Sequence, residues 1–173
     1  VGHWFEAAGF RLALALFGAL SLDYASALGG WLGRRIGPWL PISDVARRNL
    51  QAAFPEKSAH EIAVVIRAMW DNLGRVAAEL TYLDEIDVYD PDGRVEMVGA
   101  EIVERLRDDG IGGIFFAAHL GNWEIMPLAA SQKDLQLTHV YRAANNPLAD
   151  ALLQRRRAPL GGAQVGKGAP GAK

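Results

Sequence analysis

A histidine and a glutamate are separated by four residues in the segment IFFAAHLGNWEIMP, which spans residues 114–127. Imidazole exchanges a proton readily near neutral pH, and a carboxylate on its second nitrogen fixes the tautomer and stabilises the imidazolium that forms. His119 and Glu124 are therefore a candidate general-base pair. Because the pattern supplies no serine nucleophile, the attacking hydroxyl would come from a substrate, which favours group transfer onto an alcohol. A structural hydrogen-bonding pair is the alternative interpretation of this spacing.

The residues between the pair favour a tight turn. Gly121 allows the backbone to turn sharply, and Asn122 can cap the helical turn that follows. The backbone N–H groups of this turn, or a cation, are candidates to bind the oxyanion of an acyl-transfer intermediate.

The second half of the chain alternates short strand-like segments with helical ones. Helices are predicted over residues 100–109, closed by Gly110, and from Asn146-Pro147 to about residue 157, with room for one more between. Strands are predicted over residues 95–98, 114–118, 135–141 and 163–165. This order predicts an α/β fold with a mainly parallel sheet flanked by helices. Chemistry gathers at the carboxyl ends of such strands, which is where His119 falls.

The first half is predicted to be helical. Ser43 can cap a helix that runs to about Phe54 and stops at Pro55. Ser58 and Glu61 have the spacing of a capping box, and apolar residues repeat at helical spacing from there to residue 80.

The N-terminal segment has an uninterrupted apolar run from Leu12 to Leu22. A bilayer span needs roughly 20 apolar residues, and extension to Leu32 includes Asp23, which costs about 2.5–3.5 kcal/mol near the bilayer centre. Three interpretations stay open: a helix in the membrane interface, a tilted single span, or an apolar core helix. Arg34-Arg35 then favours a cytoplasmic flank beside anionic lipid.

We expect residues 1–42 to be an apolar, membrane-associating helical segment and residues 43–173 to be the N-terminal part of the α/β domain. The chain begins on Val and ends on GGAQVGKGAPGAK, so we expect the domain to be incomplete at its C-terminus.

Composition excludes several classes of function. The 173 residues suit one domain, and the net charge of −2 does not favour nucleic-acid binding. The absence of cysteine excludes disulfides, thiolate metal sites and a cysteine nucleophile. Three consecutive arginines, residues 155–157, either form a solvated helix end or contact lipid phosphate or an acidic carrier protein.

The segment AAHLGNWE resembles the H-x4-(D/E) box of the lysophospholipid acyltransferase superfamily, and its GNWE spelling is similar to the bacterial lipid A late acyltransferase branch (lauroyl/myristoyl type). Four further blocks agree in order and spacing with that branch. They are ARRNLQAAFPE (46–56), MWDNLGRVAAEL (69–80), VEMVGAEIVERL (95–106) and VYRAANNPLAD (140–150).

The resemblance implies an enzyme at the cytoplasmic face of the bacterial inner membrane. It would move a fatty acyl chain from an acyl carrier protein thioester, or acyl-CoA, to a hydroxyl of a glycolipid such as a lipid A precursor. It implies that His119 is the general base and Glu124 its orienting partner, that Arg142 meets phosphate or the oxyanion, and that Gly121 and Asn122 shape the site. It implies no metal and no cofactor, because a thioester is already activated. A non-catalytic lipid-binding module of the same fold and a lipid hydrolase are the alternatives.

Overall fold

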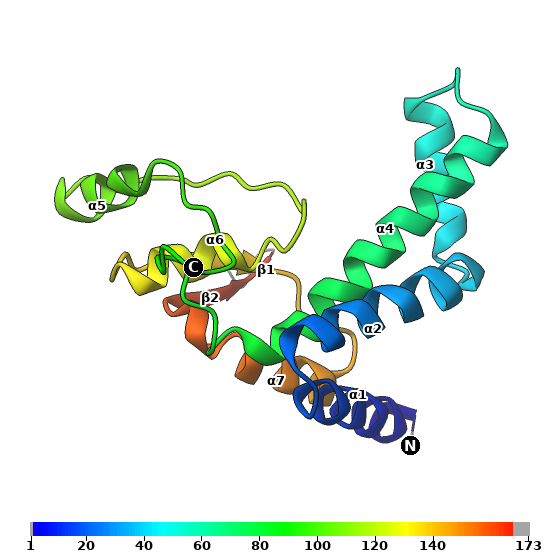
Figure 1. Ribbon diagram of the computed structural model, residues 1–173, viewed down its shortest axis with the longest axis horizontal. Helices are drawn as coiled ribbons and strands as arrows, with labels where there is room; N and C mark the ends of the chain where they lie inside the picture. The colour runs from blue at the N-terminus through cyan, green and yellow to red at the C-terminus, as the bar shows by residue number, and fades with distance from the viewer. Residues whose placement is uncertain (1, 168–173) are drawn as a thin grey trace. The chain divides into compact units, whose positions relative to one another are not determined.

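The computed structural model describes residues 2–167 (Figure 1). Contacts divide the chain into two compact units. One unit is formed by residues 17–79 and is entirely helical. The other combines residues 2–16 with residues 80–167, and it contains the His119–Glu124 segment.

The helical unit contains α2 (Leu22–Ile36), the short helix η1 (Gly37–Trp39), α3 (Ser43–Ala53) and α4 (Ala59–Glu79). The helices predicted from Ser43 and after the capping box are confirmed. In the box, the Ser58 N–H donates to Glu61 Oε2 at 2.8 Å and the Glu61 N–H donates to Ser58 Oγ at 3.3 Å. These reciprocal bonds begin α4.

The predicted cap at Ser43 is wrong. Ile42 precedes the first turn of α3, and Ser43 is buried. Its hydroxyl donates to the Gly37 carbonyl at 2.7 Å and accepts from Trp70 Nε1 at 2.8 Å. The hydroxyl is therefore used in packing between η1 and α4 rather than at the helix end.

The mixed unit contains α1 (Gly2–Gly18), η2 (Leu80–Tyr82), α5 (Ala100–Asp108), α6 (Ile125–Gln132), β1 (Thr138–Tyr141), α7 (Pro147–Arg156), η3 (Ala158–Leu160) and β2 (Ala163–Gly166). Its buried core gathers around α6 and consists of Leu80, Leu83, Val88, Leu128, Ala129 and Leu160. The Gln132 side chain joins this core to the preceding loop, since it accepts from the Val88 N–H at 2.8 Å and donates to the Ile86 carbonyl at 2.7 Å.

The expected parallel pairing is confirmed for two strands. β1 and β2 pair in parallel, with Thr138 opposite Ala163 and Val140 opposite Val165. The helices predicted around them are also present, and Asn146 Oδ1 caps α7 by accepting from the N–H groups of Leu148 and Ala149.

The strands predicted at residues 95–98 and 114–118 are absent from the structure, so the sheet among residues 2–167 is smaller than predicted. Residues 111–120 are exposed and lie outside helices and strands. Strand formation requires a neighbouring strand to satisfy the backbone groups, and the described sheet pairs β1 with β2 alone. The composition of these two segments favours a strand but does not provide the neighbouring strand that each would need.

The N-terminal apolar segment does not form one long helix. α1 ends at Gly18 and α2 begins at Leu22, so a continuous span from Leu12 to Leu32 is not formed. Within residues 2–167, none of the helices combines the length and apolar character needed to cross a bilayer. Association with the membrane interface stays a prediction.

Candidate active site

His119 lies at the end of the extended, exposed segment of residues 111–120. The next residue but one, Gly121, has φ +54°, and this left-handed conformation turns the chain toward α6 as predicted. The His119 ring packs edge-on against the Trp123 indole, with centroids 4.9 Å apart and planes 66° apart. The imidazole is therefore open to solvent on one side and held by an aromatic contact on the other.

Glu124 is buried, with 4% of its surface exposed, and it precedes the first residue of α6. Arg157 Nε lies 3.0 Å from Glu124 Oε1 and 3.1 Å from Oε2, and Arg157 Nη2 also donates to Oε1. Trp123 Nε1 donates to Oε1 at 3.1 Å. A buried carboxylate needs such partners because desolvation disfavours an isolated charge.

Asn122 shapes the turn between the two residues. Its Oδ1 accepts from the Glu124 N–H at 3.2 Å, and its carbonyl accepts from the Ile125 N–H at 3.2 Å. These bonds place the Glu124 carboxylate at the start of α6, where the helix dipole favours a negative charge. Asn122 thus caps the turn that leads into α6 rather than the first residues of α6 itself.

His119, Trp123 and Glu124 therefore form a continuous series of contacts: ring against ring, then indole N–H to carboxylate. In the described part of the chain the Glu124 carboxylate accepts from Arg157 and Trp123 and makes no hydrogen bond with His119. Arg142 is exposed just after β1 and has no described hydrogen bond to any of these residues. Among residues 2–167, the predicted hydrogen bond between the His119 imidazole and the Glu124 carboxylate is therefore not formed; Trp123 lies between the two side chains, and Arg142 contacts neither.

Arg157 is the residue of this site that sequence reasoning missed. It lies 33 positions after Glu124, and in the sequence it follows Arg155 and Arg156 in one basic run. The structure separates Arg157 from that run, because its side chain turns inward and forms a bidentate pair. The local sequence contains no signal for this pairing.

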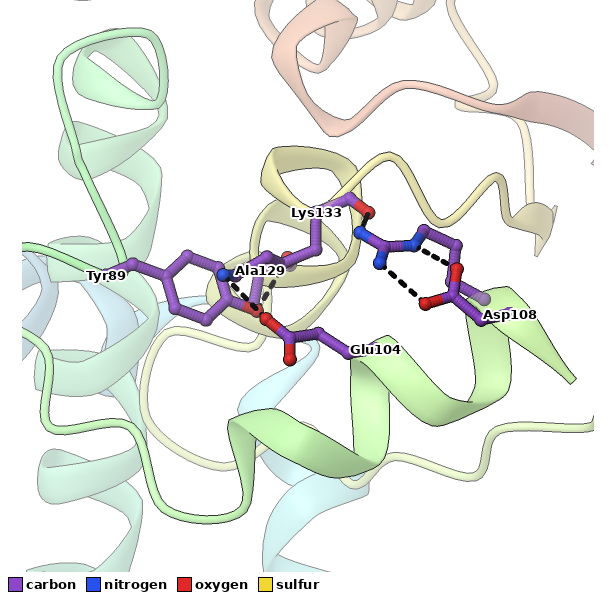
Figure 2. Close-up of polar contacts among 6 residues, drawn as sticks. Tyr89, Glu104, Asp108, Ala129 and Lys133 are labelled. Atoms are coloured by element: carbon purple, nitrogen blue, oxygen red, sulfur yellow. Dashed lines mark hydrogen bonds and ion pairs between the residues drawn. The ribbon is translucent and has the colours of Figure 1, made fainter.

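A polar network holds α5 beside the C-terminal end of α6 (Figure 2). Lys133 Nζ donates to Glu104 Oε1 at 2.9 Å and lies 4.5 Å from the centre of the Tyr89 ring. Tyr89 Oη donates to the Ala129 carbonyl at 3.0 Å, and Arg107 Nη1 donates to the Lys133 carbonyl at 3.1 Å. The network fixes the C-terminal end of α6.

Charges within this network shift the pKa values of its members. The hydrogen bond from Lys133 lowers the pKa of Glu104 and raises that of Lys133 itself. Burial raises the pKa of Tyr89. Both ions of the Lys133–Glu104 pair are stabilised near neutral pH, so the pair is a structural contact rather than a proton-transfer unit.

The arrangement can support proton transfer at the exposed His119 imidazole, whose ring contacts the Trp123 indole that Glu124 holds. No cluster of three His, Asp or Glu side chains suited to a metal ion occurs in residues 2–167. A group transfer that uses an activated acyl donor needs only a base, a hydroxyl and donors for the oxyanion.

A profile of the bacterial lipid A biosynthesis acyltransferase family matches residues 2–169. The chain belongs to this family, and membership indicates that the protein is an acyltransferase. Searches among curated proteins and among solved structures found no match.

Proposed function

We propose that the protein transfers a fatty acyl chain from an acyl carrier protein thioester, or from acyl-CoA, to a hydroxyl of a glycolipid such as a lipid A precursor. The observation that supports this most directly is the family match, which includes the complete H-x4-E box and its surroundings. Exposure of His119 beside the buried Glu124 adds a site at which a lipid hydroxyl can approach the base.

In the proposed reaction, a neutral His119 nitrogen takes the proton of the acceptor hydroxyl while the hydroxyl oxygen attacks the thioester carbonyl carbon. The carbonyl electrons move onto oxygen, and N–H groups of the turn at Gly121 and Asn122 stabilise that oxyanion. The carbon–sulfur bond then breaks, the oxyanion re-forms the carbonyl, and the imidazolium returns its proton to the leaving thiolate. The products are an ester and a thiol, and no electron carrier is needed.

Glu124 acts on His119 in this proposal as a positioning group. Its carboxylate fixes the Trp123 indole by a hydrogen bond, and the indole edge fixes the imidazole. Because Arg157 neutralises the Glu124 carboxylate, Glu124 contributes the position of the ring rather than an unpaired negative charge. Arg142 would bind a phosphate of the acceptor or help to neutralise the oxyanion.

The protein would work at the cytoplasmic face of the bacterial inner membrane, where its lipid acceptor lies. α1 supports membrane contact, because large apolar side chains stay exposed along it: Trp4, Phe5, Leu12 and Leu16. Such a helix can lie in the interface without crossing the bilayer.

Mass spectrometry of membrane lipids tests the proposal. Cells with and without the gene that encodes this chain would be compared, and the expected result is one glycolipid that loses a single fatty acyl mass when the gene is deleted. Restoration by the wild-type gene but not by His119→Ala would assign the reaction to this site. Release of free fatty acid without an acylated glycolipid would favour a hydrolase instead. Lipid binding with no change in lipid masses would favour a non-catalytic module.

A further inference from the structure

α1 and the C-terminal half of α7 line a half-open cavity of about 330 Å³. The Asn146 side chain at the start of α7 contacts α1, since its Nδ2 donates to the His3 carbonyl at 2.8 Å and to Glu6 Oε2 at 3.0 Å. The volume falls within the ~300–1,000 Å³ range of small-molecule sites. The cavity is lined by Arg11, Leu14, Ala15, Leu152, Arg155 and Arg156.

Three of these six lining residues are arginines, and none is acidic. In the part of the chain that the structure describes, none of the three guanidinium groups has a hydrogen bond or an ion pair to another residue. Other arginines of the protein are paired with carboxylates, among them Arg34, Arg75, Arg107 and Arg157. Three like charges around one cavity repel one another, and a bound anion would offset this repulsion.

Helix electrostatics explains only part of the cluster. Arg155 and Arg156 lie in the last turn of α7, where the helix dipole favours a positive charge. Arg11 lies in the interior of α1, far from either of its ends, so the dipole gives no reason for its place. The buried Leu14 and the half-buried Leu152 provide an apolar wall beside the cations.

We propose that this cavity binds the phosphate ester of an amphiphile. The planar guanidinium groups of Arg11, Arg155 and Arg156 match the geometry of phosphate oxygens and would each donate to them. The first methylenes of the attached apolar chain would contact Leu14 and Leu152. The site goes beyond the proposed acyl transfer and shares no residue with the His119–Glu124 site.

Calorimetric titration of the 173-residue chain tests this proposal with three probes: dihexanoyl phosphatidic acid, glycerol 3-phosphate and inorganic phosphate. The phosphatidic acid should bind at least tenfold more tightly than either chain-free probe. Substitution of Arg11→Gln or Arg156→Gln should weaken its binding about tenfold or more, the scale of lost hydrogen bonds between charged groups. Leu152→Ala should weaken the binding of phosphatidic acid but not that of inorganic phosphate.

Arg105→Gln is the matched control, because it removes an exposed positive charge from the last turn of α5, outside the cavity. It should leave the affinity for phosphatidic acid unchanged. Circular dichroism reports whether each variant folds. Arg11→Lys keeps the positive charge but removes the planar guanidinium group with its paired N–H donors. This variant should therefore fold and still bind phosphatidic acid more weakly than the wild type. Wild-type affinity in the Arg11 and Arg156 variants would overturn the proposal, and so would equal affinity for all three probes.

Discussion

A methyl group added to Gly74 has no room where α4 crosses α2. A Cβ at Gly74 would lie 2.8 Å from the Gly29 carbonyl carbon, and one at Gly29 would lie 2.9 Å from Ala78 Cβ. Carbon atoms prefer separations of ~3.5–4.0 Å, so the two helices would have to move apart. The crossing therefore depends on glycine at both positions.

The size of the effect follows from two opposing contributions in Gly74→Ala. Alanine is favoured over glycine in a helix interior by about 1 kcal/mol, and overpacking of a well-packed contact costs typically about 1–3 kcal/mol. Because the obstructing atoms belong to backbone, which cannot rotate away, we expect the upper part of that range. The net expectation is destabilisation by about 2 kcal/mol.

Urea denaturation followed by circular dichroism measures this change. Ala68→Gly is the control, since Ala68 is exposed on the same helix and its substitution should destabilise by about 1 kcal/mol through helix propensity alone. If Gly74→Ala instead stabilises the protein by about the amount that Ala68→Gly destabilises it, the close crossing of α2 and α4 is refuted.

Three further predictions concern particular contacts, and each is tested by urea denaturation. Arg157→Gln leaves the Glu124 carboxylate buried without its cation and should lower the free energy of unfolding by about 3 kcal/mol. Adding Glu124→Gln to this variant should recover part of the lost stability. Unchanged stability of the Arg157→Gln variant would contradict the ion pair. The Ser58 hydroxyl and N–H lower the pKa of Glu61, so folding stability should fall as the pH drops through that pKa, and Glu61→Gln should flatten this acid limb. Burial raises the pKa of Tyr89, so stability should decline as the pH rises above about 10, the ordinary tyrosine value. An alkaline limb unchanged by Tyr89→Phe would argue against that burial.

Features that depend on residues close together in the sequence were predicted correctly. The capping box at Ser58 and Glu61, the Asn146-Pro147 helix start and the turn at Gly121 are each decided within a few residues, and the structure has all of them. Hydrogen-bonding partners this close in sequence cost little chain entropy to bring together, so residue type and spacing suffice to predict them.

Features that depend on distant residues were not predictable. The segment 114–118 has the composition of a strand, but strand formation depends on a neighbour that the segment cannot provide. The sequence around Ser43 predicts a helix cap, but its hydroxyl accepts a hydrogen bond from Trp70, which is 27 residues away. The ion pair between Arg157 and Glu124 likewise joins residues 33 positions apart, and the sequence around either residue does not indicate it.

The role of His119 as general base is the central claim, and the rate of acyl transfer by His119→Ala tests it most directly. The protein would be assayed with an acyl carrier protein thioester and with the glycolipid acceptor identified by mass spectrometry. Because His119 is exposed and its one described contact is with Trp123, the variant should keep the wild-type unfolding midpoint while kcat/KM falls by at least about 100-fold, the lower end expected for a positioned base. His60→Ala, which removes an exposed imidazole from α4, should leave the rate unchanged. Near wild-type transfer by His119→Ala would contradict the account.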